Sequence, residues 1–388
     1  MLKLLFQSRR TLFSVPGGDT VQILRTAEAL RRLGLTVEVD ATGEASPRGF
    51  DLVHLFNLMR PQEVWSAARK AHDYGLPIAL STIYGPYVEF DRNRRSGLPG
   101  LLARLLPHST FESVKILGRL VVNGERHPGV WRMLYRGYRN AQMDILRWTS
   151  VLLPNSEPEG QRVFADFSVA NSCHVQVVPN AMDPVVFHPE HHCPNCERVR
   201  ATHGEGFVLC VARIEGRKCQ LALAQALADT SHRLVLVGKP GPNSQAYFDQ
   251  LKTLALGGLA CDLVGQVDPD QLPCYYRAAG VHALVSWMET PGLSSLEAAA
   301  MGIPIVVTGK GDTRAYFGDE ANYCEPEDVV SIAQALREAR CGYGRAARLM
   351  TRVRSQYTWD AAAAATLKGY EAALMFRETP PNLQSSLS

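Results

Sequence analysis

The sequence predicts an α/β protein with two domains, each built on a doubly wound parallel sheet. Short β-rich runs alternate with helical patterns along the chain, and this alternation occurs in both halves. A repeated order of strand, crossover helix and strand is the signature of parallel sheets. The 388 residues are too many for one typical domain, and a hydrophobic content of 46% is enough to fill two cores.

The predicted strands fall into two sets, which are separated by a polar, proline-containing segment. The first set covers residues 2–6, 35–40, 51–56, 77–82, 151–154 and 174–179, and the second covers residues 206–212, 233–238, 261–265, 281–287 and 303–308. We interpret residues 184–205 as a linker, because they are polar and contain Pro184, Pro189 and Gly204. Ligands of such sheets bind at the carboxyl ends of the strands.

Composition and charge favour a cytoplasmic enzyme. The net charge of +3 is too small to indicate a nucleic-acid-binding protein. Apolar Leu4 and Leu5 are soon followed by Arg9 and Arg10, and no apolar run reaches the length of a signal sequence or a membrane span. The nine cysteines are an odd number, several of them within predicted strands or helices, which fits reduced thiols better than a disulfide framework.

The charge is concentrated in one segment. Residues 92–147 contain eleven Lys or Arg but only three acidic residues, Glu112, Glu125 and Asp144, and leucines and valines at spacings that predict basic amphipathic helices. Two interpretations remain open. The segment is either a solvated helical face, or it attaches to an anionic membrane surface or recognises a pyrophosphate-bearing lipid acceptor.

Glu289 and Glu297 are the most informative pair of residues in the chain. They lie eight positions apart, between an apolar run and a helix-like segment. Thr290 can cap a helix whose first residue is Pro291, so the N–H groups at its start would attract phosphate. Glu297, about two turns inside the helix, can then reach a polyol, while Glu289 is aimed at the same space from the loop. A diphosphate between two sugar-like rings suits this arrangement.

Arg213 and Lys218 follow a predicted strand and lie five residues apart, so both cations can converge on one diphosphate leaving group. Alone, such a pair is more typical of an ordinary surface loop, but beside the two glutamates we favour a functional role. Gly17 and Gly18 follow the first strand and would let the backbone approach a ligand, although many turns of this kind contain a glycine pair.

Two further motifs could suggest a metal site. Asp268-Pro269-Asp270 is the one Asp-x-Asp in the chain, and we interpret it as a capping box because Pro269 fits a first helical position and Gln271 follows Asp268 by three residues. The segment from His191 to Cys196 has two cysteines at zinc spacing but no second pair at the usual distance, so a zinc site is the less favoured alternative. We expect no metal and no cofactor.

The second half of the chain resembles glycosyltransferase family 4, the glycosyl transferases group 1. The matching segments are Val211-Ala212-Arg213-Ile214-Glu215-Gly216-Arg217-Lys218, Val237-Gly238, Val264-Gly265-Gln266-Val267, the two glutamates, and Ala300-Met301-Gly302-Ile303-Pro304-Ile305-Val306-Val307-Thr308. The resemblance continues in Pro16-Gly17-Gly18-Asp19, Val178-Pro179-Asn180-Ala181-Met182-Asp183 and Tyr357-Thr358-Trp359-Asp360.

This resemblance implies the GT-B fold, in which two Rossmann-like domains face each other. Residues 1–183 would form the acceptor-side domain and residues 206–356 the nucleotide-sugar domain. A helix at residues 357–376 would cross back to the first domain, followed by a flexible tail at residues 377–388.

The resemblance also implies a role for each residue of the predicted site. Arg213 and Lys218 would hold the diphosphate, together with the backbone N–H groups of Gly292, Leu293 and Ser294. Glu297 would bind the ribose and Glu289 the donor sugar, and the backbone near Val267 would contact the base. Gly17 and Gly18 would approach the donor from the first domain.

One position departs from the family. Many members have a histidine near the donor sugar where this chain has Tyr84, whose phenol can donate a hydrogen bond to a sugar or acceptor but cannot carry a positive charge at neutral pH. His54 ends a predicted strand, where it either contacts the sugar or acceptor or packs in the core.

We therefore predict a metal-independent, retaining transferase that moves a hexose-type sugar from a nucleotide-diphosphate donor to a glycan or lipid-linked acceptor, in bacterial surface polysaccharide biosynthesis. It would be cytoplasmic, with peripheral attachment to the inner face of the membrane left open. A sugar-nucleotide epimerase, a phosphorylase and a catalytically silent partner subunit of the same fold remain alternatives. An NAD-dependent enzyme is disfavoured, because no Gly-x-Gly-x-x-Gly with a downstream acidic residue follows either first strand.

Overall fold

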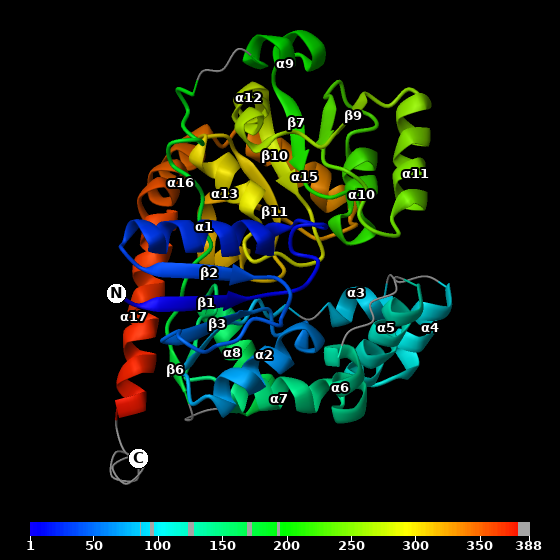
Figure 1. The fold of residues 1–388 in the computed structure, drawn as a ribbon. Helices are drawn as coiled ribbons and strands as arrows, with labels where there is room; N and C mark the ends of the chain where they lie inside the picture. Colours follow the sequence, from blue (N-terminus) through cyan, green and yellow to red (C-terminus); the bar gives the residue numbers. More distant parts are fainter. Residues whose placement is uncertain (86, 94–96, 123–127, 169–172, 192–194, 379–388) are drawn as a thin grey trace. The chain divides into compact units, whose positions relative to one another are not determined.

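The computed structural model describes residues 1–85, 87–93, 97–122, 128–168, 173–191 and 195–378. The chain divides into two compact units, which we call unit 1 (Met1–Pro179 with Trp359–Ser388) and unit 2 (Asn180–Thr358). Each unit contains one six-stranded sheet, and its paired strands are parallel (Figure 1).

The sheet of unit 1 has the strand order β2-β1-β3-β4-β5-β6. Its strands are β1 Lys3–Gln7, β2 Thr36–Asp40, β3 Leu52–Phe56, β4 Ile78–Ser81, β5 Val151–Leu152 and β6 His174–Val175. All residues of β3 and β4 are buried, as expected for parallel strands that are covered by helices on both faces.

The helices of unit 1 include the crossover connections, a helical insertion and the last helix of the chain. The connecting helices are α1 Gly18–Arg32, α2 Pro61–Asp73, α7 Tyr138–Trp148 and α8 Glu157–Phe167; the insertion between β4 and β5 contains α3 Val88–Asn93, α4 Gly97–Leu105, α5 His108–Val122 and α6 Pro128–Arg136. The last helix, α17 (Trp359–Glu378), packs beside α1, where Arg32 forms an ion pair of 2.6 Å with Asp360. Residues 379–388 of the predicted tail lie outside the described residues.

The sheet of unit 2 has the strand order β12-β11-β10-β7-β8-β9. Its strands are β7 Phe207–Val211, β8 Leu234–Val237, β9 Cys261–Gly265, β10 Ala279–Leu284, β11 Ile305–Thr308 and β12 Asn322–Cys324, of which the short β12 was not predicted. The helices are α9 Asn195–His203, α10 Gln220–Ala226, α11 Gln245–Leu256, α12 Leu272–Ala278, α13 Leu293–Ala300, α14 Thr313–Phe317, α15 Val329–Arg340 and α16 Tyr343–Gln356, with 3-10 turns at Gly216–Lys218, Pro269–Gln271 and Gly318–Glu320.

The structure corrects three predictions about local structure. The prediction that residues 184–205 form a linker is wrong. Helix α9 lies within this range and buries Cys196 and Val199 in the core of unit 2. Asp268 precedes a 3-10 turn but makes no side-chain capping bond there, so the predicted capping box is wrong. Cys274 is disulfide-bonded, in contrast to the expected reduced thiols, whereas seven other cysteines among the described residues are free, as expected.

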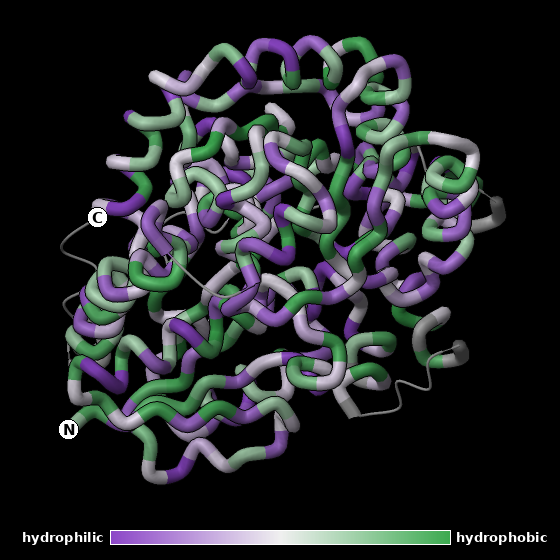
Figure 2. The backbone as a smooth tube through the Cα atoms, turned by 90° about the horizontal axis from the view of Figure 1, so that it is seen from above, coloured by the Kyte–Doolittle hydropathy of each residue, from purple (hydrophilic) through white to green (hydrophobic). Residues whose placement is uncertain are grey.

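The distribution of hydrophobic and hydrophilic residues agrees with helices that pack on sheets. In Figure 2 the helical turns alternate between hydrophilic and hydrophobic colours, as amphipathic helices on a sheet do. Among the described residues, no helix is both long and apolar enough to cross a membrane.

Candidate active site

Most of the predicted site residues of unit 2 follow its two central strands. Strands β7 and β10 are hydrogen-bonded neighbours, but the chain proceeds from β7 toward β8 on one side and from β10 toward β11 on the other. The carboxyl ends of two such strands form the switch point where doubly wound sheets bind ligands. Arg213 and Lys218 follow β7, and Glu289 and Glu297 follow β10.

The loop after β7 is held close to the sheet by backbone contacts. A Cβ atom on Gly238, which follows β8, would lie 1.9 Å from the carbonyl oxygen of Ala212, so this approach requires glycine. The side chain of Gln220 donates a hydrogen bond of 2.8 Å to the carbonyl oxygen of Arg213. These contacts fix the loop that carries the two predicted cations.

Lys218 and Glu289 form an ion pair, and both side chains are largely buried. Lys218 ends a 3-10 turn, while Glu289 is positioned by the amide of Asp312, which donates to its carbonyl oxygen at 2.9 Å. The two loops are also tied together by the amide of Trp287, which donates to the carbonyl oxygen of Arg217 at 2.9 Å. The structure thus brings together one cation and one carboxylate of the predicted site.

Helix α13 begins two residues later than predicted. Its first residue is Leu293 and its N-cap is Gly292, so the prediction that Thr290 caps the helix and Pro291 begins it is wrong. Gly292 has a φ of 86°, and a Cβ atom there would lie 2.5 Å from a side-chain carbon of Leu284. The N–H groups of Leu293 and Ser294 belong to the first turn, where helix geometry leaves amides without intrahelical acceptors.

Glu297 lies on α13 and makes a contact that the sequence did not reveal. The hydroxyl of Tyr276, on α12, donates a hydrogen bond of 2.8 Å to Oε2 of Glu297. Burial raises the pKa of the Glu297 carboxyl to about 7, and the hydrogen bond from Tyr276 acts in the opposite direction. Tyr276 lies 21 residues away in the sequence, without a motif that would connect the two.

The remaining predicted donor contact of unit 2, Val267, lies two residues beyond β9. The amide of Gly238 donates to the carbonyl oxygen of Gly265 at 2.7 Å, so the segments that follow β8 and β9 are joined. Val267 is partly buried and packs against the core of unit 2.

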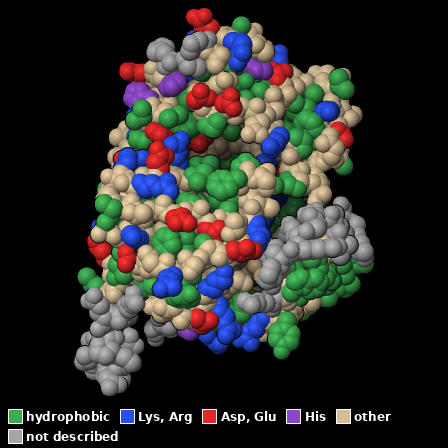
Figure 3. Space-filling model, in the orientation of Figure 1, with side chains coloured by type: hydrophobic (Ala, Val, Ile, Leu, Met, Phe, Trp, Pro, Cys, Tyr) green, Lys and Arg blue, Asp and Glu red, His purple; other side chains and the backbone are tan. Residues whose placement is uncertain are grey.

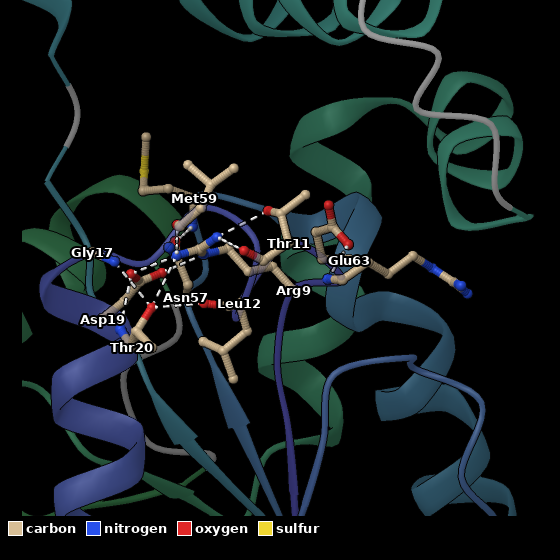
Figure 4. Close-up of polar contacts among 11 residues, drawn as sticks. Arg9, Thr11, Leu12, Gly17, Asp19, Thr20, Asn57, Met59 and Glu63 are labelled. Atoms are coloured by element: carbon tan, nitrogen blue, oxygen red, sulfur yellow. Dashed lines mark hydrogen bonds and ion pairs between the residues drawn. The ribbon is translucent and has the colours of Figure 1, made fainter. Parts of the chain in front are cut away.

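Unit 1 has its own switch point, between β1 and β3, and an arginine organises it. Figure 4 shows the guanidinium of Arg9 surrounded by Thr11, Asp19 and Thr20. Arg9 is only 5% exposed and donates to both carboxylate oxygens of Asp19, at 2.6 and 2.9 Å. The amide of Gly17, the N-cap of α1, donates to Oγ1 of Thr20 at 3.0 Å, so the segment with Gly17 and Gly18 is held by this network.

Asp19 is charged over a wide pH range. Burial alone would raise the pKa of its carboxyl, but the hydrogen bond and charge of Arg9, with smaller contributions from Arg60 and the amide of Thr20, hold the pKa below its ordinary value. The sequence offered one signal for Arg9, the position of a charged residue two places after a buried strand.

His54 belongs to the core of unit 1. It is 1% exposed, and its two ring nitrogens lie 2.7 Å from the hydroxyl of Tyr370 and 2.9 Å from Oγ of Ser81. Burial lowers the pKa of His54 to about 3, which keeps the ring neutral. The predicted contact of His54 with a sugar or acceptor is therefore wrong.

Tyr84 is also largely buried, with 6% of its surface exposed. Its hydroxyl donates to Asp166 at 2.6 Å, and its amide donates to Glu159 at 2.8 Å. Burial and the hydrogen bond to Asp166 raise the pKa of its phenol.

Tyr84 lines a cavity of about 240 Å³ within unit 1. The other lining residues are Met59, His108, Ser109, Tyr138, Arg139, Gln142 and Phe167. The guanidinium of Arg139 lies 5.1 Å from the ring centre of Phe167. A second, open depression on unit 2, at Arg337, Arg345 and Arg348, contains no predicted site residue.

Metal ligands are not grouped in the part of the chain that the structure describes: no three residues of the types His, Cys, Asp and Glu are placed to hold an ion there. The zinc alternative at His191 to Cys196 includes residues 192–194, which lie outside the described residues.

The chain is similar to a known protein family and to several curated proteins. The model of the Glycosyl transferases group 1 matches residues 205–340. A D-inositol 3-phosphate glycosyltransferase from Xylanimonas cellulosilytica is 30% identical over 390 residues, which cover 91% of this chain and 91% of the relative. A protein of the same name from Arthrobacter sp. is 27% identical over 299 residues, which cover 72% of this chain and 69% of the relative.

Solved structures of other proteins have a fold similar to that of this chain. Sucrose-phosphate synthase from Thermosynechococcus elongatus has a TM-score of 0.72 at 17% identity, covering 98% of this chain and 100% of that one. HepE from Anabaena, in complex with UDP and glucose, has a TM-score of 0.67 at 15% identity, covering 96% and 100%. Two doubly wound units of this kind define a GT-B protein. The chain belongs to the glycosyl transferases group 1, and it is a glycosyltransferase.

Proposed function

We propose that this glycosyltransferase is a retaining, metal-independent hexosyltransferase whose donor, a nucleotide-diphosphate sugar, binds to unit 2. The observation that carries the proposal is the ion pair of Lys218 with Glu289 beside the start of α13, at the switch point of the sheet. Arg213 and Lys218 would neutralise the diphosphate, with the N–H groups of Gly292, Leu293 and Ser294 as further donors.

The ion pair of Lys218 and Glu289 also supports a mechanism in which the sugar passes directly from the donor to the acceptor. When the diphosphate binds, Lys218 can exchange Glu289 for a phosphate oxygen, which leaves the Glu289 carboxylate to accept hydrogen bonds from the donor sugar. The bond from the anomeric carbon to the phosphate oxygen then breaks, and a bond to the acceptor oxygen forms on the same face. The departing phosphate takes the acceptor proton, so no carboxylate base is required.

We place the acceptor in the cavity of unit 1. Its volume of about 240 Å³ lies below the roughly 300–1,000 Å³ of sites for drug-sized ligands, which favours a single ring over a long glycan. Arg139 and His108 supply nitrogen donors, and Tyr84 and Tyr138 supply aromatic faces. The relatives named D-inositol 3-phosphate glycosyltransferase favour a phosphorylated polyol, whereas the sequence alone favoured a glycan or lipid-linked acceptor for surface polysaccharide.

Transfer assays with a panel of acceptors distinguish a phosphorylated polyol from a glycan or lipid-linked acceptor. With the correct donor, the enzyme should glycosylate a phosphorylated cyclitol or sugar, and Arg139→Ala should raise the KM for that acceptor more than it lowers kcat. Transfer to lipid-linked oligosaccharides alone would contradict this choice and favour the polysaccharide role. Release of free sugar from the donor without any acceptor would favour a phosphorylase or epimerase.

A thermal-shift panel of UDP-, GDP-, ADP- and dTDP-sugars tests the donor site itself. A ligand at one hundred times its dissociation constant stabilises the protein by about 2.7 kcal/mol, which shifts the melting temperature measurably. We expect one donor class to raise it. If no nucleotide sugar does so, donor binding by unit 2 is wrong.

We also propose that helices α4–α6 attach the enzyme to an anionic membrane surface. Their exposed apolar residues are Leu101, Leu105, Leu117, Trp131 and Tyr135, with 47–95% of each exposed. Figure 3 shows hydrophobic side chains gathered over these helices. The basic composition of the segment adds attraction to anionic lipids, although Lys115 pairs with Glu112 and Asp91, and Arg136 pairs with Asp144.

Vesicle co-sedimentation tests this attachment. Binding to vesicles with phosphatidylserine should fall at high salt, and Trp131→Ala with Tyr135→Ala should weaken it. Tyr74→Ala, which removes an exposed aromatic residue elsewhere on unit 1, is the matched control. Absent binding at low salt, or binding that neither salt nor the double variant changes, would contradict the proposal.

A further inference from the structure

Tyr276 is a fully buried residue whose side-chain hydroxyl contacts Glu297 of the predicted donor site. Its ring centre lies 5.8 Å from that of His282 on β10 and 5.9 Å from that of Phe187, so packing restricts its rotation. Its hydroxyl donates to Oε2 of Glu297 at 2.8 Å. No hydrogen bond to the other oxygen, Oε1, is seen within the described residues.

We propose that Tyr276 positions Glu297 for donor recognition: its hydroxyl holds Oε2, so that the carboxyl group presents Oε1 to the ribose hydroxyls of the donor. The inference rests on the proposed role of Glu297 in donor binding. A side chain that is fixed before binding loses less conformational freedom when the ligand arrives.

The surroundings of Glu297 make this hydrogen bond important. Burial raises the pKa of the Glu297 carboxyl to about 7, and the bond from Tyr276 is the contact that counteracts the rise. Cys210 on β7 acts electrostatically on the Tyr276 phenol, and the charges of Lys218 and Glu289 act on Cys210. His282 remains neutral, because burial lowers its pKa to about 3. Without the Tyr276 hydroxyl, the pKa of Glu297 should therefore rise further.

Donor affinity measured across pH 5.5–9 by calorimetry tests the proposal on the full-length protein. In the parent, affinity should increase with pH as Glu297 ionises around pH 7. In Tyr276→Phe, affinity near neutral pH should be about tenfold weaker, and the increase should move to higher pH. Glu297→Gln should lose this pH dependence.

A double-mutant cycle separates positioning from a general packing role. If Tyr276 acts through Glu297, Tyr276→Phe should not weaken donor binding further in the Glu297→Gln background. Tyr275→Phe is the matched control, since this neighbour on α12 packs against His203 instead. It should leave both the affinity and its pH dependence unchanged.

Two results would overturn the inference: additive effects in the cycle, or an unchanged pH dependence in Tyr276→Phe. If Tyr276→Phe does not fold, replacement of all tyrosines by 3-fluorotyrosine keeps each ring and strengthens the phenol as a donor. The increase in donor affinity should then occur at a lower pH than in the parent. An unchanged pH dependence would overturn the inference. Failure of the parent to bind any nucleotide sugar would instead refute the proposed function on which it rests.

Discussion

At the scale of single residues, the candidate site contains an ion pair between Lys218 and Glu289. Lys218 and Glu289 follow two different strands, and their side chains form a largely buried ion pair. Buried ion pairs contribute little to stability on balance, because desolvation offsets their attraction. The position of this pair at a switch point therefore supports the proposed exchange with a charged substrate.

Lys218→Ala should lower turnover by on the order of a hundredfold, the scale of losing one preorganised electrostatic contact. Kinetics with saturating donor measure this effect, with unfolding curves to confirm that the protein remains folded. Lys252→Ala removes an exposed lysine on α11 and is the control. Normal turnover in Lys218→Ala would exclude this residue from the mechanism.

Glu297→Gln should weaken donor binding and change how stability depends on pH. The folded-state pKa of about 7 lies above the ordinary value of 4.5, so Glu297 contributes stability that is present below about pH 4.5 and is lost as pH rises through 7. Glu297→Gln has no carboxyl group at this position, so its stability does not fall with pH in this way. Its melting temperature relative to the parent should therefore be higher at pH 8 than at pH 4.5, and an equal difference at both values would contradict the raised pKa.

Residues of the site differed in how far the sequence could predict them. Lys218 and Glu289 were predictable, because each belongs to a short motif next to a strand. Tyr276 was not, because its contact with Glu297 depends on how α12 and α13 pack. His54 was ambiguous for a similar reason: its partner Tyr370 lies 316 residues away, and only the docking of α17 shows that both ring nitrogens are occupied.

At the scale of elements, the sequence predicted eleven of the twelve strands found among the described residues, since buried parallel strands are continuous apolar runs. The exception, β12, has only three residues, too few for a pattern. Helix ends were harder to predict. Thr290 and Pro291 suit a helix start, but Gly292 is the residue that can adopt a φ of 86° against Leu284, so tertiary contact determined where α13 begins.

Gly292→Ala should therefore destabilise unit 2 and displace the start of α13. Backbone strain should cost about 1–3 kcal/mol, with an added cost for the clash with Leu284. Gly258→Ala is the matched control, because Gly258 also has a positive φ, of 102°, but faces open space. Urea unfolding should show a greater loss for Gly292→Ala, together with weaker donor binding. Equal losses would mean that contact with Leu284 does not set the helix start.

At the scale of the whole molecule, the two units share one plan: a doubly wound sheet with its charged residues at the switch point. In unit 1 the pair of Arg9 and Asp19 lies between β1 and β3, and in unit 2 the pair of Lys218 and Glu289 lies between β7 and β10. The sequence predicted this plan from the alternation of strands and helices. The hydrogen-bonding partners at each switch point depended on side-chain packing, which periodicity does not encode.

The last prediction concerns the balance of charge during the reaction. A departing nucleoside diphosphate must be stabilised by cations, which come either from a bound metal or from the protein itself. Unit 2 offers Lys218 and Arg213 after β7 and the first amides of α13 after β10, three sources of positive charge from neighbouring strands. Once the donor is bound, these groups already face the phosphates, so they need no reorganisation as charge develops in the reaction. Turnover with the correct donor should persist in EDTA and should not increase when Mg²⁺ or Mn²⁺ is added. Loss of activity on chelation, with recovery on adding either ion, would show that a metal and not these side chains neutralises the leaving group.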